Sequence, residues 1–377
     1  MTQTTAVSQI PFFRYPHLFN QQRDDVLQAL VDVMERGAYI LQRDLQDFEN
    51  AVAGFVHARH AIGVANGTDS MLLGLRALGI GAGDEVILPS HTYVATASAV
   101  HFVGATPVLV ECSPDHLIDP EAVAAAITPR TAGILPVHLN GRTCDMDALQ
   151  HLATRHGLAL VEDAAQALGS QYRGRHAGTF GAWGSFSLYP AKVLGCFGDG
   201  GLVTTDDPEV ARKVRLLRDH GRDETGEVVT WGLNSRLDNL QAAILNVKLR
   251  RFPQEIERRR RIAAMYRERL QDLDDMTLPP GPTGDPDHFD VYQNYEVEAG
   301  QRDRLREHLE RDGVRTIIQW NGKAVHQFAG LGLGDLHLPR TDRLFRRCFL
   351  LPMNTSLTDD EVDYICTSIR RCYGRPA

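Results

Sequence analysis

Two kinds of hydrophobic pattern follow one another in a regular order between residues 61 and 161. Short runs that are almost wholly apolar are separated by longer stretches in which apolar side chains recur at helical spacing. Strands this apolar, separated by helices, are typical of a mostly parallel sheet covered on both faces, and so of a three-layer α/β sandwich. The expected strands are 85–89, 106–110, 132–137 and 158–161, and the expected helices are 70–78, 96–102, 119–127 and 146–156.

The pattern changes after about residue 250. A loop rich in proline and glycine at 279–286 follows two long helical patterns, and shorter elements come after it. We therefore expect a large domain over 1–250 and a smaller C-terminal α+β domain over 251–377. The elements expected outside the central region are helices at 21–36, 237–249, 254–273 and 301–311, strands at 294–297 and 315–319, and a last helix from Thr358, with a capping box to Glu361.

Composition limits the partners that the chain can have. The net charge of -8 over 377 residues gives no electrostatic footprint for nucleic acid. The most apolar stretch, 93–110, is interrupted by His101, Gly104 and Pro107, so we expect a buried helix and strand there and no membrane span. Residues 1–13 lack the pattern of a secretory signal, and the six cysteines show no metal-ligand spacing. These features predict a cytoplasmic protein with free thiols and no metal.

A lysine and an aspartate carry the candidate chemistry. Lys192 follows the small, apolar and aromatic run 184–191, and no acid comes near it in sequence before Asp199. A desolvated lysine loses its charge readily, as bond formation with an aldehyde requires. Asp163 directly follows an apolar strand, at the edge where such sheets bind ligands. A Schiff-base lysine and a carboxylate that keeps a pyridine nitrogen protonated are the parts needed to hold pyridoxal phosphate. Taken singly, a loop lysine and a helix-capping aspartate are the alternatives.

Three further positions fit the same cofactor. Residues 66–70, Asn-Gly-Thr-Asp-Ser, open a helix directly after an apolar run, and backbone N–H groups at a helix start suit a phosphate. The same residues also make a good helix cap, so this motif does not decide alone. Ser187 is a second candidate for the phosphate. Gln166 lies one turn along from Asp163 and could reach the phenolic oxygen of the ring; an exposed helix residue is its alternative.

Together these segments resemble the nucleotide-sugar aminotransferases of the DegT family, within the aspartate-aminotransferase fold type I. The likeness covers almost the whole chain from about residue 21. The segments that carry it are 66–68 (NGT), 82–86 (AGDEV), 161–166 (VEDAAQ), 187–192 (SLYPAK) and 232–238 (GLNSRLD).

The resemblance implies a role for each matching position around the cofactor. Lys192 would form the Schiff base, Asp163 would hold the pyridine nitrogen and Gln166 would bond the phenolic oxygen. The family also implies that each active site is shared between two subunits, which makes the homodimer obligatory for activity. The residues expected to bind the phosphate are Gly67, Thr68 and Ser187, with Asn234 reaching it from the neighbouring subunit, and Tyr93 is expected to stack on the ring.

Substrate contacts are implied at Tyr189, Arg236 and His326. Many relatives have a histidine where this chain has Tyr189, and the Tyr-Pro form resembles members that act at C3 of the sugar. Many relatives also carry a His-Tyr-Pro segment in the small domain, where this chain reads IIQWNGKAVH over 317–326. His326 is expected to face the sugar, whereas Trp320 and Lys323 imply an altered pocket.

The expected reaction is the transfer of an amino group from L-glutamate to a nucleotide-linked keto sugar, with a 3-keto sugar favoured. The freed amine of Lys192 would act as the general base. The alternatives are a 4-keto-sugar or carbocycle aminotransferase, or a non-catalytic regulatory or binding protein on the same scaffold. A sugar dehydratase of this fold would carry histidine in place of Lys192, and a Rossmann oxidoreductase would need an early G-x-G-x-x-G after a strand.

Overall fold

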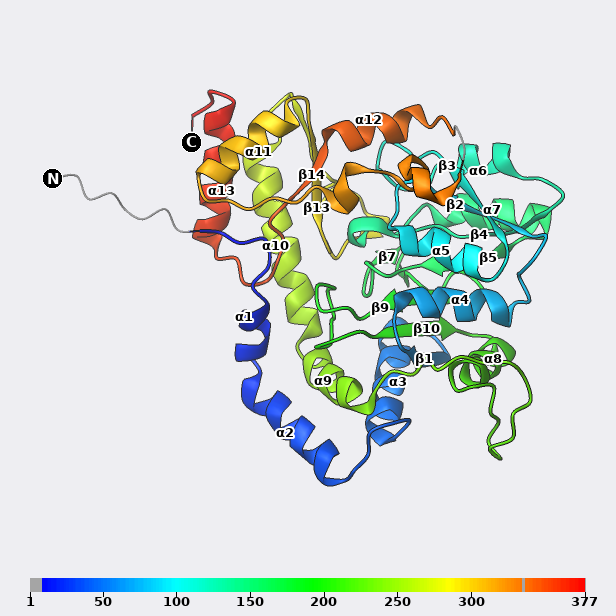
Figure 1. Ribbon diagram of the computed structural model, residues 1–377. Helices are drawn as coiled ribbons and strands as arrows, with labels where there is room; N and C mark the ends of the chain where they lie inside the picture. The colour runs from blue at the N-terminus through cyan, green and yellow to red at the C-terminus, as the bar shows by residue number, and fades with distance from the viewer. Residues whose placement is uncertain (1–8, 334–335, 377) are drawn as a thin grey trace.

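In this computed structural model, which describes residues 9–333 and 336–376, two four-stranded sheets form the centre of the molecule (Figure 1). The first, β3-β2-β4-β5, is parallel throughout. The second, β1-β10-β9-β6, continues it through a parallel bridge between Val137 and Asp163. Within these two sheets β10 runs in the direction opposite to the other strands. The strands are β1 (His60–Val64), β2 (Glu85–Pro89), β3 (Thr106–Val110), β4 (Thr131–Ile134), β5 (Ala159–Leu160), β6 (Glu162–Asp163), β9 (Gly184–Ser187) and β10 (Gly201–Thr205).

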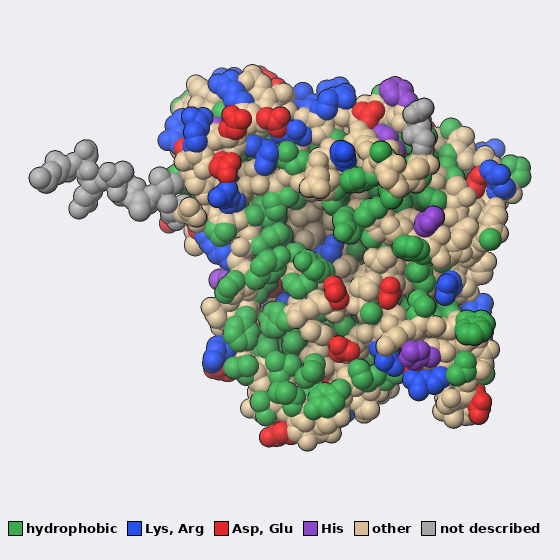
Figure 2. All heavy atoms as spheres, in the orientation of Figure 1, with side chains coloured by type: hydrophobic (Ala, Val, Ile, Leu, Met, Phe, Trp, Pro, Cys, Tyr) green, Lys and Arg blue, Asp and Glu red, His purple; other side chains and the backbone are tan. Residues whose placement is uncertain are grey.

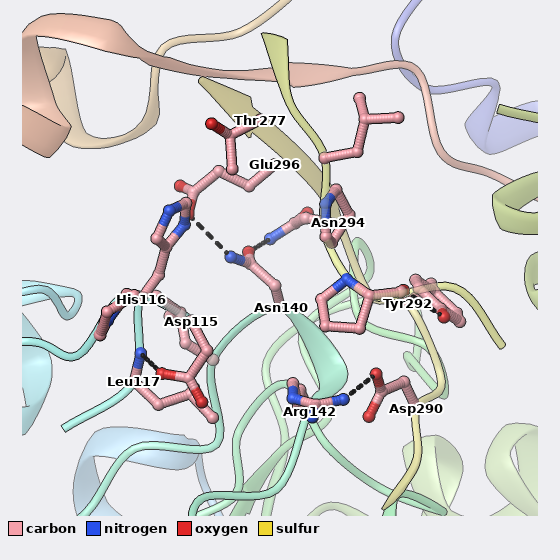
Figure 3. Close-up of a pocket in the computed structure, with 15 residues that line it drawn as sticks. Asp115, His116, Leu117, Asn140, Arg142, Thr277, Asp290, Tyr292, Asn294 and Glu296 are labelled. Carbon is pink, nitrogen blue, oxygen red and sulfur yellow. Dashed lines mark hydrogen bonds and ion pairs between the residues drawn. The ribbon is translucent and has the colours of Figure 1, made fainter. Parts of the chain in front are cut away.

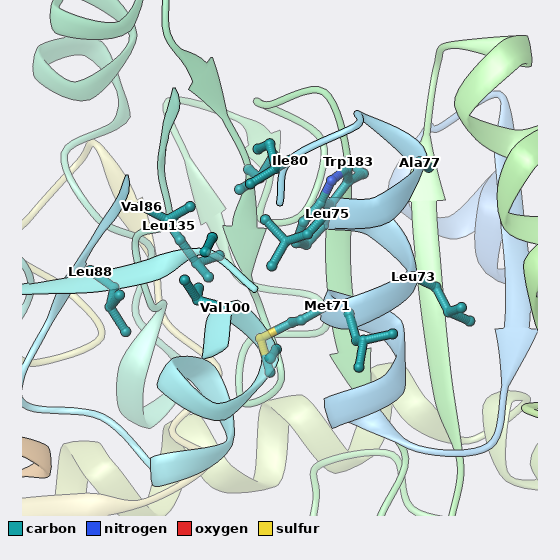
Figure 4. Close-up of a cluster of buried hydrophobic side chains, with 14 of the residues drawn as sticks. Met71, Leu73, Leu75, Ala77, Ile80, Val86, Leu88, Val100, Leu135 and Trp183 are labelled. Carbon is teal, nitrogen blue, oxygen red and sulfur yellow. The ribbon is translucent and has the colours of Figure 1, made fainter. Parts of the chain in front are cut away.

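Both faces of this combined sheet are buried under helices. Val86 and Leu88 pack on one face with α4 and α5, whereas Ile87 between them points to the other face and packs near α6 and α7. Figure 4 shows the first of these cores, where Trp183 lies beside α4. The covering helices are α3 (Arg43–Val56), α4 (Gly67–Ala77), α5 (Val94–Phe102), α6 (Pro120–Ala126), α7 (Met146–His156), α8 (Pro208–Arg218) and α9 (Asn239–Leu249), and α2 (Arg23–Glu35) packs on α9.

A second core lies in the C-terminal part, beyond the long helix α10 (Phe252–Leu270) (Figure 1). Its antiparallel sheet has the order β11-β13-β14, and Tyr295 and Phe349 are fully buried against α10 and α13. The N-terminal residue Ile10 joins this core and bridges to Val314. The remaining elements here are β11 (Met276–Thr277), β13 (Tyr295–Ala299), β14 (Cys348–Leu351), α11 (Arg302–Arg311), α12 (Pro339–Arg347) and α13 (Asp359–Cys372).

A third, small sheet joins the two parts of the chain. Its order is β12-β7-β8, and β12 (His288–Phe289) pairs antiparallel with β7 (Gln171–Tyr172) of the large part. The hairpin partner of β7 is β8 (Arg175–His176). Beyond β12 the chain runs through residues 290–294 into β13, so this segment connects the central layers to the C-terminal sheet.

Most of the expected elements are confirmed. Strands 85–89 and 106–110 and helix 146–156 have the predicted bounds, and the capping box between Thr358 and Glu361 forms. The strand expected at 315–319 is wrong: Ile317 makes a single bridge to Leu350, and the chain then turns through Trp320 and Asn321 in the left-handed region. Four α-helices were not predicted: α1 (Tyr15–Asn20), α3, α8 and α12. Within residues 9–333 and 336–376, no helix has the length and apolar character needed to cross a bilayer.

Candidate active site

A cavity of about 780 Å³ lies at the carboxyl ends of the central strands, in the size range of small-molecule sites. Figure 2 shows the molecule hollowed between the C-terminal part and the layer that carries α4 and α5. The cavity is lined both by the ends of parallel strands and by residues of the C-terminal part, namely Gln293, Asn294, Ile317, Gln319, Trp320 and Leu350. The residues predicted for the site that line it are Gly67, Thr68, Tyr93, Asp163, Gln166, Ser187, Tyr189 and Lys192.

Lys192 lies in the loop 188–200 that joins β9 to β10. The loop turns back on itself, since the backbone N–H of Cys196 donates to the carbonyl of Leu188 at 2.8 Å. Burial lowers the pKa of Lys192 to about 8, and the nearby Asp163 carboxylate only partly opposes this shift. A neutral amine is therefore accessible near neutral pH, which is the form that attacks an aldehyde.

Asp163 ends β6 and is buried at the floor of the cavity. Burial raises its pKa, whereas the hydroxyl of Thr96, which donates to Oδ2 at 2.7 Å, and the N–H of Ala165, which donates to Oδ1 at 3.1 Å, both favour the charged form. A buried carboxylate that is held by two donors fits a cationic partner. A protonated pyridine nitrogen is such a partner.

The cavity wall includes the start of a helix, a feature that suits a phosphate. The side chain of Asn66 caps α4 by accepting from the N–H of Asp69 at 2.8 Å, so the first N–H groups of the helix point outward beside Thr68. Gly67 faces Ser187 closely: a Cβ on Gly67 would lie 2.9 Å from the Cβ of Ser187. The space between α4 and the end of β9 is therefore kept open by a glycine.

Gln166 is oriented by a network of amides. Its Oε1 accepts from the backbone N–H of Asn140 at 2.7 Å, and because an N–H can only donate, the amide oxygen must face that way. The Asn140 side chain donates to Glu296 at 3.2 Å and accepts from Asn294 at 2.9 Å, as Figure 3 shows. The NH₂ group of Gln166 is left to face the cavity, where it can donate to a phenolic oxygen.

Glu296 anchors the far end of this network. Burial alone would raise its pKa, but the neighbouring His91 and His116 hold it below the usual range, with His116 Nδ1 at 2.9 Å from Oε1. A charged carboxylate accepts only, so it fixes the Asn140 amide with its nitrogen toward Glu296. The polarity of the whole chain of amides is thereby set by one buried ion pair (Figure 3).

Aromatic side chains border the mouth of the cavity. Tyr93 and Tyr189 are about half exposed, and the ring of Tyr93 lies 6.4 Å from that of Trp320. Trp320 has a φ of 50°, a left-handed conformation that a bulky residue adopts only where its surroundings hold it. Trp320, which belongs to the segment that differs from the His-Tyr-Pro segment of many relatives, therefore lies in the cavity wall.

Three predicted residues do not line the cavity within one chain. His326 does not reach the cavity, because its Nδ1 lies 2.7 Å from the Ser90 hydroxyl and its Nε2 lies 3.0 Å from Asp342. Asn234 and Arg236 follow the exposed loop after α8, and Arg236 donates to Asp219 at 2.7 Å. Their expected role depends on a second subunit.

Residues that the sequence did not single out complete the site. Thr96 donates to Asp163, Asn140 orients Gln166, and Gln293 contacts the backbone on both sides of Lys192. These contacts join positions 26 to 102 residues apart in the chain. No local pattern marks them, since each side chain would look ordinary in its own segment.

The fold and the site together define a pyridoxal-phosphate-dependent aminotransferase of fold type I. Residues 20–370 match the DegT/DnrJ/EryC1/StrS aminotransferase family, and the chain belongs to that family. Its cofactor is pyridoxal phosphate. Lys192, Asp163 and the Gly67–Ser187 cleft fit this group, as a low-pKa amine, a buried carboxylate with room for a cation and an open helix N-terminus.

Similar proteins include sugar transaminases. A dTDP-3-amino-3,4,6-trideoxy-alpha-D-glucose transaminase of Streptomyces venezuelae is 42% identical over 98% of this chain and 98% of its own. A UDP-N-acetyl-3-dehydro-alpha-D-glucosamine 3-aminotransferase of Acidithiobacillus ferrooxidans is 39% identical over 98% of this chain and 99% of its own. The crystal structure of S. venezuelae DesV in complex with a ketimine intermediate matches with a TM-score of 0.93 at 42% identity, over 98% of this chain and 100% of that one.

Proposed function

We propose that this protein transfers an amino group from L-glutamate to C3 of a nucleotide-linked 3-keto sugar. The single observation that carries the proposal is a cavity that holds Lys192 and Asp163 together, in a chain whose similar proteins are named for 3-amino and 3-dehydro sugars. Tyr189, which follows Leu188 after the β9 serine, supports the same choice of carbon. The choice of L-glutamate as the amino donor rests on the family alone.

The cavity residues would divide the work around the cofactor. Pyridoxal phosphate supplies an aldehyde that takes up an amine and a ring that withdraws electrons from the adjacent carbon. Lys192 would hold that aldehyde at rest, and its Nζ would then move the proton from the α-carbon of the donor. Asp163 would keep the ring nitrogen protonated. The residues proposed for the remaining contacts are Gly67, Thr68 and Ser187 for the phosphate, Gln166 for the phenolic oxygen and Tyr93 for stacking.

The proposed enzyme is a homodimer in which Asn234 reaches the phosphate of the partner's cofactor and Arg236 approaches the substrate. Exposed hydrophobic side chains support an interface, because large apolar patches on a surface mark sites of association. In Figure 2 such side chains gather over α1, α2 and α9. Those exposed on α2 and just after it are Leu27, Val31, Met34, Tyr39, Ile40 and Leu41.

Two further proposals concern the chain as a whole. The large domain is proposed to extend over 1–250 and the small one over 251–377, supported by the separate hydrophobic cores on either side of α10. A cytoplasmic location is supported by the six free cysteines, of which five are buried.

The absorbance spectrum of the loaded protein tests the function. With pyridoxal phosphate bound through Lys192, we expect a visible band that L-glutamate converts to a near-ultraviolet band, and a UDP- or dTDP-linked 3-keto sugar should restore it. Restoration by a 4-keto sugar alone would overturn the assignment to C3. A band that other amino acids discharge but L-glutamate does not would overturn the donor. The Lys192→Ala variant should show neither conversion.

A further inference from the structure

The two peptide groups that flank Lys192 are both held by one side chain. The backbone N–H of Val193 donates to Oε1 of Gln293 at 2.6 Å, and Nε2 of Gln293 donates to the carbonyl of Ala191 at 2.7 Å. Gln293 is 4% exposed and lines the cavity. One buried amide therefore brackets Lys192 with a donor and an acceptor, a pairing that only an amide side chain supplies in this orientation.

Gln293 is in turn held from α10. Nη1 of Arg259 donates to the carbonyls of Tyr292, Gln293 and Met353 at 3.1–3.2 Å. Arg259 is buried, and burial lowers its pKa to about 10; in the part of the chain that the structure describes it makes no ion pair with a carboxylate. Within the described residues the buried Nε of Arg259 has no hydrogen-bond partner. A buried guanidinium is costly unless it is hydrogen-bonded, so Arg259 depends on the three carbonyls that Nη1 contacts.

The backbone around Gln293 is held from the other side as well. Tyr292 has a φ of 49°, and a Cβ on Gly141 would lie 2.7 Å from the backbone nitrogen of Gln293. The loop 139–141 that contains this glycine also carries Asn140, which orients Gln166. Residues 292–294 are thus packed between α10 and the loop that contacts the cofactor-facing glutamine.

The loop of Lys192 has a second amide clamp that serves for comparison. Oε1 of Gln241 accepts from the N–H of Phe197 at 2.9 Å, and its Nε2 donates to the carbonyl of Phe197 at 3.3 Å. Gln241 thus makes the same two bonds on the same loop, five residues beyond Lys192. The two glutamines differ in the groups that they contact: Gln293 bonds the peptide groups on either side of Lys192, whereas Gln241 bonds the N–H and the carbonyl of Phe197.

We propose that Gln293 is a positioning residue that fixes the direction of the Lys192 side chain toward the reacting carbon. The proposal rests on the role of Lys192 in the proposed function. The peptide groups before and after a residue determine where its Cα–Cβ bond points. The N–H of Lys192 donates to the carbonyl of Tyr189 at 2.9 Å, and Gln293 adds a side-chain contact to each of the two peptide groups. Residues 292–294 lead into β13. The Gln293 amide therefore connects the C-terminal sheet to the backbone on both sides of Lys192.

The test compares Gln293→Met with Gln241→Met, both loaded with pyridoxal phosphate. Methionine keeps the volume and length of glutamine and removes both hydrogen bonds. We expect Gln293→Met to slow the single-turnover discharge of the visible band by L-glutamate by about 10- to 100-fold, as a small misplacement of a catalytic group does. The pH at which half of the visible band is lost should also shift. Gln241→Met should match the parent in both measurements.

The outcomes separate this inference from the proposed function. If the parent protein shows no visible band with pyridoxal phosphate, the role of Lys192 fails and the inference with it. If the parent shows the band and Gln293→Met matches it in rate and pH midpoint, the inference alone is overturned. Equal effects of the two variants would also overturn it, because they would reflect loop rigidity in general. Should Gln293→Met fail to fold, Gln293→Glu and Gln241→Glu carry the same comparison, since glutamate keeps the acceptor and loses the donor.

Discussion

At the scale of single residues, the chemistry of this site is created by surroundings more than by residue type. Lys192 is one of four lysines in the chain, and burial lowers its pKa to about 8. Asp163 is buried with a raised pKa and two donors, so a cation placed beside it would bring it back to the charged state. The pair is prepared for a cofactor that carries an aldehyde and a protonatable ring nitrogen.

The lowered pKa of Lys192 predicts how the cofactor-free protein takes up pyridoxal phosphate. Only the neutral amine attacks, and it makes up about a tenth of Lys192 at pH 7, against less than about one in a thousand for an ordinary lysine. The uptake rate should therefore rise about tenfold per pH unit below about 8 and level off above it. Stopped-flow absorbance measures this rate. The same measurement on free lysine with a blocked α-amino group gives the pH dependence that comes from pyridoxal phosphate itself, which is then subtracted. A rate that keeps rising steeply to about pH 10 would show an unperturbed lysine.

The close approach of Gly67 and Ser187 predicts a large effect of one methyl group. In Gly67→Ala the new Cβ must displace Ser187 or the start of α4, and both border the proposed phosphate position. We expect the dissociation constant for pyridoxal phosphate to rise at least about tenfold, about 1.4 kcal/mol of binding free energy. Gly54→Ala is the matched control, because Gly54 is in α3 with open space around it. Equal affinity in the two variants, measured by fluorescence titration, would argue against a phosphate there.

The local sequence identifies some of these residues and not others. Lys192 and Asp163 can be predicted because a charged group beside a small, apolar run is unusual within its own segment. Thr96 and Gln293 cannot be predicted in this way. Thr96 contacts a residue that lies 67 positions away in the chain, and Gln293 contacts residues 100 and 102 positions away. The contact of His326 with Ser90 is equally invisible in the local sequence, because Ser90 lies 236 positions earlier.

At the scale of elements, strands buried on both faces were the easiest to predict. In β2 every residue is buried, so the apolar run itself marks the strand and its ends. The expected strand at 315–319 failed because its apolar residues pack beside β14 without forming a ladder, and backbone turns at Trp320 and Asn321 end the extended chain. Apolar content alone does not distinguish a strand from an extended segment that lies against one.

One buried side chain joins several elements beneath the site. Glu162 in β6 accepts from the N–H groups of Gly178 and Gly181 at 2.7 Å each, and from His138 at 2.9 Å. Glu162→Gln retains one acceptor and turns an NH₂ group toward donors, which we expect to lower the free energy of unfolding by about 2–3 kcal/mol. Glu209→Gln, which breaks an exposed pair with Arg212, should leave the free energy of unfolding almost unchanged. Urea unfolding measures both, and equal losses would contradict the argument.

At the scale of the whole molecule, one chain encloses the cavity and also carries exposed apolar side chains outside it. Trp231 is 93% exposed, and Val228 and Val229 beside it are more than half exposed, in the same loop that leads to Asn234. A fully exposed tryptophan is unusual on a monomer, since large apolar side chains are normally covered. The loop is therefore proposed to lie against the second subunit, where it would bring Asn234 to the other cavity.

Shared sites make a quantitative prediction for mixed dimers. Lys192→Ala and Asn234→Ala should each be nearly inactive alone, because every site in either homodimer lacks one residue. Unfolded or dissociated together and reassembled in equal amounts, they should form hybrids in half of the dimers. One of the two sites in each hybrid would combine an intact Lys192 with an intact Asn234, so activity should return to about a quarter of the parent level.

Lys192→Ala mixed with Asp163→Asn supplies the control for this experiment. Both residues line the cavity of one protomer, so each site in such a hybrid would keep a defect and the mixture should stay inactive. Recovery in the first mixture and not in the second would establish that Asn234 acts across the interface. If neither mixture recovers although mass measurement shows hybrid dimers, each site is built from one chain, and the exposed loop with Trp231 must serve association without completing the chemistry.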